Sequence, residues 1–267
     1  MTQDTQGPAV LAQGDARGVL TLTLNRPHNF NALSVEMLTA LQTEIDTAAR
    51  DDTLRVLVLA ANGKAFCPGH NLKEMIAEPA LAYYQSLFAQ CSRMMLSLQQ
   101  LPVPVIARVQ GMATAAGCQL VAQCDLAVAS SEASFAVSGV NFGLFCSTPS
   151  VPLSRNVGAK HAMEMLLTGD FIGADEALAR GLVNRVCAPD ALDTTVEALV
   201  ASILRKPRVA VAMGKALFYQ QREVGIAAAY QLAGQTMAVN MMDAAAQEGV
   251  LAFTEKRTPS WRQEGAA

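Results

Sequence analysis

Two short segments of the 267-residue chain place small residues directly before a predicted helix: "FCPGHNL" at 66–72 and "MATAAGCQ" at 112–119. The first N–H groups of a helix have no partner inside it, and the helix dipole favours negative charge at that end. Two such ends that face one point would form an oxyanion hole, in which backbone N–H groups hold a developing negative charge.

Gln119 is the one long polar side chain in the first turn of the second of these helices, within "GMATAAGCQLVAQCD" at 111–125. A carboxylate at this position could accept and release a proton at working pH, whereas an amide cannot. We therefore expect Gln119 to hold or orient a group and not to move a proton.

The elements that must position these segments alternate between strand and helix. Residues 18–25 alternate with the period of a strand, and 54–60, 103–111 and 125–130 are short runs typical of buried strands. Helices are predicted after the N-cap Ser34, near Leu72, over 80–99 and within 111–125. This alternation predicts an α/β fold with largely parallel strands. From about residue 158 the chain is predicted to be helical, and its Ala- and Met-rich helices from 194 suit packing between subunits.

The composition limits the partners and the location of the protein. The chain is 51% hydrophobic and 16% charged with a formal net charge of −3, and its Lys and Arg are scattered, so a small-molecule ligand is expected and nucleic acid is not. The most apolar stretch, 109–124, carries three Gln residues and is interpreted as a buried helix, so no membrane span is expected. The first 18 residues resemble neither a secretory signal nor a transit peptide, which predicts a cytoplasmic protein. The six Cys residues lack the spacing of a metal or redox site, so we expect reduced thiols and no metal.

Several motifs together resemble the enoyl-CoA hydratase/isomerase (crotonase) family. They are "LNRPHNFNALSVEMLTAL", "GKAFCPGHNLKEM", "VPVIARVQGMATAAGCQLVAQCDLAVAS", "LLTGDFIGADEALARGLVNRV" and "AFTEKRTPSW", and they run from about residue 18 to 261. The resemblance implies an α/β fold with a crotonase-like ββα spiral core and a C-terminal helical trimerisation region. The expected organisation is a flexible N-terminus at 1–17, the spiral core at 18–193 and the helical region at 194–267. It also implies a homotrimer or hexamer and a coenzyme A thioester as substrate, with no other cofactor.

Carried onto this sequence, the resemblance assigns the two thioester-binding donors to the backbone N–H groups of His70 and Ala116. Ala116 stands where the family usually has Gly, and we expect it to have a helical, negative φ. The two glutamates that family hydratases use fall on Gln119 and Gly139, so hydration is expected to be weak or absent.

The substrate-binding residues implied by the resemblance are Arg26, Phe66, Phe253 and Lys256. Arg26 could meet a phosphate, and Phe66 begins the first donor segment. Lys256 and Phe253 would contact the CoA phosphate and adenine, often from a neighbouring subunit.

Three functions stay open at this point. The first is a weak or specialised enoyl-CoA hydratase/isomerase, the second is decarboxylation or hydrolysis of an acyl-CoA, and the third is a non-catalytic acyl-CoA-binding module. Candidates by position for a replacement base are Glu74, Glu132, Cys118, Cys146 and the His70 ring. If only the carboxylates are missing, Gln119→Glu combined with Gly139→Glu would raise hydration.

Overall fold

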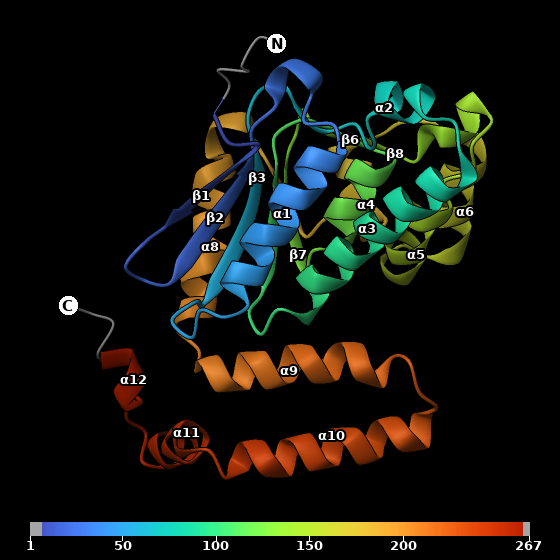
Figure 1. Cartoon of the computed structure of the whole chain (residues 1–267). Coiled ribbons are helices and arrows are strands. Elements are labelled where there is room, and N and C mark those ends of the chain that lie inside the picture. Colours follow the sequence, from blue (N-terminus) through green and yellow to red (C-terminus); the bar gives the residue numbers. More distant parts are fainter. Residues whose placement is uncertain (1–6, 264–267) are drawn as a thin grey trace.

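The computed structural model describes residues 7–263, and its larger sheet has six strands in the order β1-β2-β3-β5-β7-β10 (Figure 1). Neighbouring strands run parallel except for the antiparallel pair β1 and β2. The strands are β1 (Val10–Gly14), β2 (Val19–Leu24), β3 (Val56–Ala61), β5 (Val105–Val109), β7 (Leu126–Ser130) and β10 (Arg185–Cys187).

A smaller sheet completes each turn of the spiral. Its order is β4-β6-β8-β9, with β9 antiparallel to β8. Three times along the chain, a strand of the large sheet is followed by a strand of the small sheet and then by a helix, so the expected ββα spiral is confirmed. The strands are β4 (Ala65–Cys67), β6 (Met112–Thr114), β8 (Ser134–Ala136) and β9 (Ile172–Gly173).

Helices cover both faces of the large sheet, which explains why β3 is an unbroken apolar run with all of its residues buried. On one face α1 buries Leu38, Leu41 and Ile45, and its N-cap Ser34 accepts a hydrogen bond from the Met37 N–H. On the other face α8 buries its own apolar stripe (Figure 1). The helices up to this point are α1 (Val35–Ala48), α2 (Leu72–Ala77), α3 (Leu81–Gln100), α4 (Ala116–Gln123), α5 (Ser147–Asn156), α6 (Ala159–Thr168), α7 (Ala174–Ala179) and α8 (Leu192–Leu204), with 3-10 helices η1 (Pro27–Asn29), η2 (Ser138–Phe142) and η3 (Pro189–Ala191).

The N-terminal segment differs from the flexible 1–17 that the sequence suggested. Residues 1–6 lie outside the described part, but Val10–Gly14 pair with β2 along their whole length. Only the first residue of this strand is buried, so the segment lacks the alternation that marks a half-buried strand.

The boundary between the spiral core and the C-terminal helical region also lies further along the chain than the expected 193/194. Helix α8 begins at Leu192 and packs against Val56, Ile106 and Val128 of the large sheet, so it belongs to the core. The region that leaves the core begins after it and comprises α9 (Arg208–Gln221), α10 (Ile226–Met241), α11 (Ala244–Thr254) and α12 (Ser260–Gln263).

We call residues 208–263 the C-terminal arm. In Figure 1 α9 and α10 lie side by side below the core, and α10 lies on the side of α9 away from it. Only Ala229 of α10 is buried, whereas Tyr230 and Met237 are 75% and 72% exposed. No helix within residues 7–263 combines the length and apolar character needed to cross a membrane.

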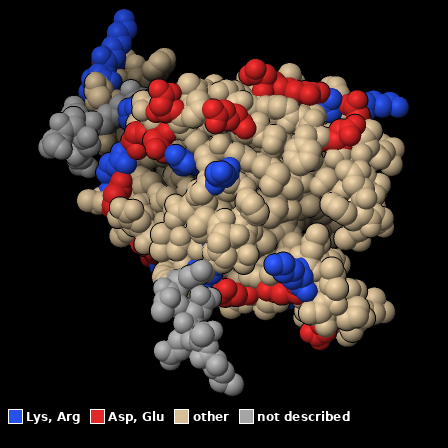
Figure 2. All heavy atoms as spheres, turned by 90° about the horizontal axis from the view of Figure 1, so that it is seen from above, with Lys and Arg blue, Asp and Glu red and all other residues tan. Residues whose placement is uncertain are grey.

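Charged side chains of both signs are interspersed on the face drawn in Figure 2. They lie mostly toward the margins of that view, with a broad uncharged area between them. This face therefore carries no patch of a single sign.

Candidate functional site

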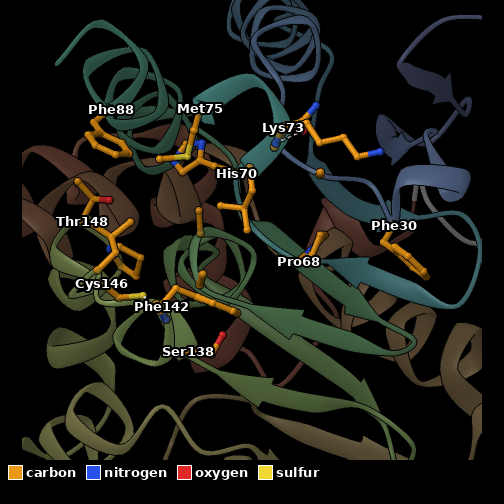
Figure 3. Close-up of a pocket in the computed structure, with 18 of the residues that line it drawn as sticks. Phe30, Pro68, His70, Lys73, Met75, Phe88, Ser138, Phe142, Cys146 and Thr148 are labelled. Atoms are coloured by element: carbon orange, nitrogen blue, oxygen red, sulfur yellow. Dashed lines mark hydrogen bonds between the residues drawn. The ribbon is translucent and has the colours of Figure 1, made fainter. Parts of the chain in front are cut away.

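A cavity of about 680 Å³ opens between the β4–α2 connection, the start of α4, η1, η2 and the start of α5 (Figure 3). Both predicted donor segments reach it, because His70 and Ala116 are among the residues that line it. Most of its lining is apolar, with aromatic rings from Phe30, Phe88 and Phe142. An enclosure of this size and character is typical of a small-molecule site.

His70 is held by its neighbours on both sides. The carbonyl of Gly69 accepts from the Leu33 N–H at 2.8 Å, and Asn71 caps α2 by accepting from the Lys73 N–H. The N–H of His70 itself donates to no acceptor within the described residues. It is therefore available to a molecule in the cavity.

Ala116 is the first residue of α4, and its N–H likewise has no acceptor in the described part of the chain. Its φ is not positive, as expected, but the preceding Ala115 has φ 50° and ψ −120°. The Ala115 N–H donates to the Ala136 carbonyl at 2.9 Å, which ties this turn to β8.

The two donor segments touch at Gly69. This residue has a φ of +99°, a conformation that L side chains rarely adopt. A Cβ on Gly69 would lie 3.0 Å from the Ala115 Cβ and 3.1 Å from the Ala116 nitrogen. Glycine thus lets the first segment approach the second donor closely.

The positions of the two family glutamates have different surroundings. Gln119 is 4% exposed and does not line the cavity, and its Oε1 has no hydrogen-bond partner within residues 7–263. Gly139 does line the cavity, but a Cβ there would lie 2.4 Å from the Leu144 carbonyl oxygen and 2.8 Å from Cys146 Sγ. A glutamate at 139 would therefore fit only if the Leu144 backbone and Cys146 moved, which argues against the expectation that Gly139→Glu would help to restore hydration.

The His70 ring packs edge-on against Phe88, with centroids 5.4 Å apart. Its two nitrogens are buried, and neither makes a hydrogen bond to a described residue. Burial lowers the pKa of His70, opposed by the nearby Leu33 carbonyl, so the ring is neutral at pH 7.

No carboxylate lines the cavity, counting all residues that the structure describes. Glu74 accepts from the Asn71 amide and the Val35 N–H, and Glu132 is exposed elsewhere on the surface. Burial raises the pKa of Cys118 to about 12, so this thiol is a structural group. Of the suggested replacement bases, Cys146 and His70 reach the cavity wall.

The expected substrate-binding residues do not gather here within one chain. Phe66 is fully buried in the hydrophobic core and does not line the cavity. Arg26 donates to Glu36 and to the Asn25 carbonyl, and it too is absent from the lining. Lys256 and Phe253 are exposed on the C-terminal arm, Phe253 by 84%.

Sequence reasoning missed several residues of the site. The cavity includes Met75, Phe88 and Ser138, and the Ser138 hydroxyl is 2.8 Å from that of Thr114. Phe88 lies inside a long helix, and no local pattern distinguishes it from a core residue. Its role becomes visible only when α3 packs beside the β4–α2 connection.

Known proteins resemble this chain over nearly its whole length. The profile of the family described as "Enoyl-CoA hydratase/isomerase" matches residues 14–264. The Xenopus laevis protein "Enoyl-CoA hydratase domain-containing protein 3, mitochondrial" is 46% identical, covering 91% of this chain and 83% of its own length. A solved enoyl-CoA hydratase from Mycobacterium smegmatis is 64% identical with a TM-score of 0.94, covering 95% of this chain and 99% of its own. Human enoyl-CoA hydratase domain-containing protein 3 is 43% identical with a TM-score of 0.91, covering 95% and 100%.

These names also correct one expectation. The cytoplasmic location predicted from the first 18 residues is contradicted, because curated relatives at 43% to 46% identity are named as mitochondrial proteins. The composition of a short N-terminal stretch was not a sufficient basis for a location.

Proposed function

Since this chain belongs to the enoyl-CoA hydratase/isomerase family, we propose that it binds an acyl-CoA thioester and stabilises negative charge on the thioester oxygen. The donors are the N–H groups of His70 and Ala116. The observation that carries this proposal is that neither group has an acceptor among the described residues and that both residues line one cavity.

The chemistry follows from where the charge develops. When a bond at C2 of a thioester breaks heterolytically, the electron pair is delocalised onto the carbonyl oxygen as an enolate. One well-placed N–H donor to such an oxygen contributes roughly 3 to 4 kcal/mol of transition-state stabilisation. The largely apolar lining lowers the local dielectric constant, which strengthens that interaction.

Hydration is weak or absent in this proposal. Adding water to a conjugated thioester needs one group to deprotonate the water and another to protonate C2, and each such group contributes about 10² to 10⁴ in rate. The cavity offers no carboxylate for either task among the described residues. Gln119 and Gly139 cannot substitute for them.

The remaining parts of the ligand fit the cavity and its mouth. The aromatic and aliphatic lining suits an acyl chain, and the exposed side chains of His28 and Lys73 at its edge suit phosphate groups. Lys256 and Phe253 would contribute CoA contacts only to the cavity of another subunit. The family's homotrimer or hexamer is therefore part of the proposal, with the C-terminal arm as the contact region.

Ala116→Pro tests the proposal. Proline removes the N–H, yet it is well tolerated at the first position of a helix. In Ala116→Pro we expect the rate of acyl-CoA turnover to be about 10²- to 10³-fold lower than in the wild-type protein. We also expect a smaller shift of the infrared C=O stretching frequency when the thioester binds. Ala159→Pro, at the exposed first position of α6, is the matched control.

Unchanged turnover and an unchanged carbonyl shift in a folded Ala116→Pro protein would refute the proposal. Hydration of short and long 2-enoyl-CoAs should stay close to the buffer rate. A thioester that binds without any turnover would instead indicate the non-catalytic module.

A further inference from the structure

The proton-carrying groups of the cavity wall form a short set. His28 and Lys73 are exposed at the mouth, and the His70 nitrogens are shielded from the cavity. The hydroxyl groups are those of Ser138, engaged with Thr114, of Ser147, which donates to the Phe145 carbonyl, and of the half-buried Thr148. Cys146 is the buried member of the set and is 6% exposed. Its thiol is far more acidic than any hydroxyl beside it.

The Cys146 side chain contacts the backbone of Gly139. Cys146 is the N-cap residue of α5, and its Sγ accepts the Gly139 N–H at 3.3 Å. The sulfur also lies 2.8 Å from the point where a Cβ of residue 139 would be, so it occupies the space that a side chain there would need. Figure 3 shows it on the wall near Ser138 and Phe142. Burial raises the pKa of Cys146, so the thiol keeps its proton at pH 7.

These features select a class of reaction. A cavity with an oxyanion hole, a protonated thiol and no carboxylate base lacks the group needed to deprotonate water or C2. It retains what is needed when the substrate itself supplies the electron pair. A thioester that carries a carboxylate at C2 supplies this electron pair when it loses CO₂, because the electrons of the breaking C–C bond form the enolate.

We propose that this protein decarboxylates malonyl-type CoA thioesters, and that Cys146 is the catalytic residue that protonates C2. The proposal rests on the proposed function, since it uses the same two backbone donors. The C2–carboxylate bond breaks and CO₂ leaves. The electron pair of that bond stays on the thioester and forms the enolate, whose oxygen is held by the His70 and Ala116 N–H groups. The S–H proton then moves to C2, and solvent returns a proton to the thiolate.

The charges around the cavity are compatible with this substrate. No Asp or Glu of the described chain lines it, so a substrate carboxylate meets no like charge on the wall. The Lys73 ammonium group at the mouth favours entry of an anionic ligand.

The test is the decarboxylation of 2-methylmalonyl-CoA in D₂O, with measurement of CO₂ and of the configuration of the C2-deuterated propionyl-CoA. The wild-type protein should release CO₂ and give one configuration, because Cys146 delivers deuterium to one face. Cys146→Ala should give nearly equal amounts of both configurations. Its CO₂ release should fall by no more than about tenfold, because bond cleavage precedes proton transfer. Cys146→Ser should restore part of the selectivity, and Cys187→Ala, whose thiol is not in the cavity, should match wild type.

The outcomes separate this inference from the function on which it rests. No binding of the CoA ester and no shift of its C=O stretch would overturn both. Binding with a C=O shift but no CO₂ from the wild-type protein would overturn only the decarboxylation. A single configuration retained in Cys146→Ala would overturn the role of Cys146, and loss of selectivity in that variant alone would support it.

Discussion

At the scale of the residue, Ala115 has a backbone conformation that a non-glycine residue rarely adopts. Its φ of 50° and ψ of −120° turn the chain directly before α4, and strain of this kind costs on the order of 1–3 kcal/mol. The Ala116 N–H, which follows this turn, has no acceptor among residues 7–263. The site thus depends on backbone geometry at 69, 115 and 116 more than on any single side chain.

The crowding around Gly139 gives a prediction about stability at the scale of the residue. Gly139→Ala should lower the free energy of unfolding by about 1–3 kcal/mol, because the new Cβ would overlap the Leu144 carbonyl oxygen and Cys146 Sγ. Urea denaturation measures this change. Gly14→Ala is the control, since no atom lies within 4 Å of a Cβ there. Equal stability of the two variants would contradict the crowding described here.

His70 gives a prediction about pH. Its folded-state pKa lies below 6.5 because of burial, so below that pH the unfolded state binds more protons than the folded state. The free energy of unfolding should therefore fall as the pH drops below 6.5, by at most about 1.4 kcal/mol per pH unit from this group. His70→Leu should flatten the dependence, whereas His161→Leu, at an exposed position, should not. Identical pH profiles for wild type and His70→Leu would disprove this assignment.

At the scale of the element, a buried cation of α9, Lys215, contacts the core. Lys215 Nζ lies 2.7 Å from an Asp125 carboxylate oxygen and also donates to the Leu98 and Val103 carbonyls. Asp125 in turn accepts from the Tyr219 hydroxyl and the Val105 N–H. This cluster joins α9 to the end of α3 and to the starts of β5 and β7.

Breaking this cluster should detach α9. Lys215→Met leaves Asp125 without its cation in a largely buried position, which typically costs about 3–5 kcal/mol. Thermal unfolding and hydrogen exchange along α9 are the measurements. Lys206→Met removes an exposed cation and should change little. Wild-type protection of α9 in Lys215→Met would show that this cluster is not needed to hold the helix.

At the scale of the whole molecule, the C-terminal arm leaves several large apolar side chains exposed to solvent. Ile226, Tyr230, Met237 and Met242 are each 72% to 76% exposed. Apolar surface on this scale is typical of an interface between subunits. These exposed side chains make the arm the candidate contact region of the proposed oligomer.

The arm should accordingly control the oligomeric state. Tyr230→Asp combined with Met237→Asp should convert the proposed trimer or hexamer into monomers, because two buried charges without partners would oppose association. Light scattering after size-exclusion chromatography gives the mass. Leu11→Asp, on the outer edge strand, should leave the mass unchanged. A monomeric wild-type protein would remove the basis for this prediction.

The sequence alone predicted the α/β alternation, the two donor segments and the replaced glutamates, because apolar periodicity, helix caps and motif residues are local in the chain. Only the tertiary structure decided which groups share the cavity. It brought Phe88 and Cys146 to the wall, took Phe66 and Arg26 away from it, and filled the space beside Gly139. These outcomes depend on contacts between segments far apart in the chain, and no local pattern encodes the distance between a sulfur at 146 and a backbone at 139.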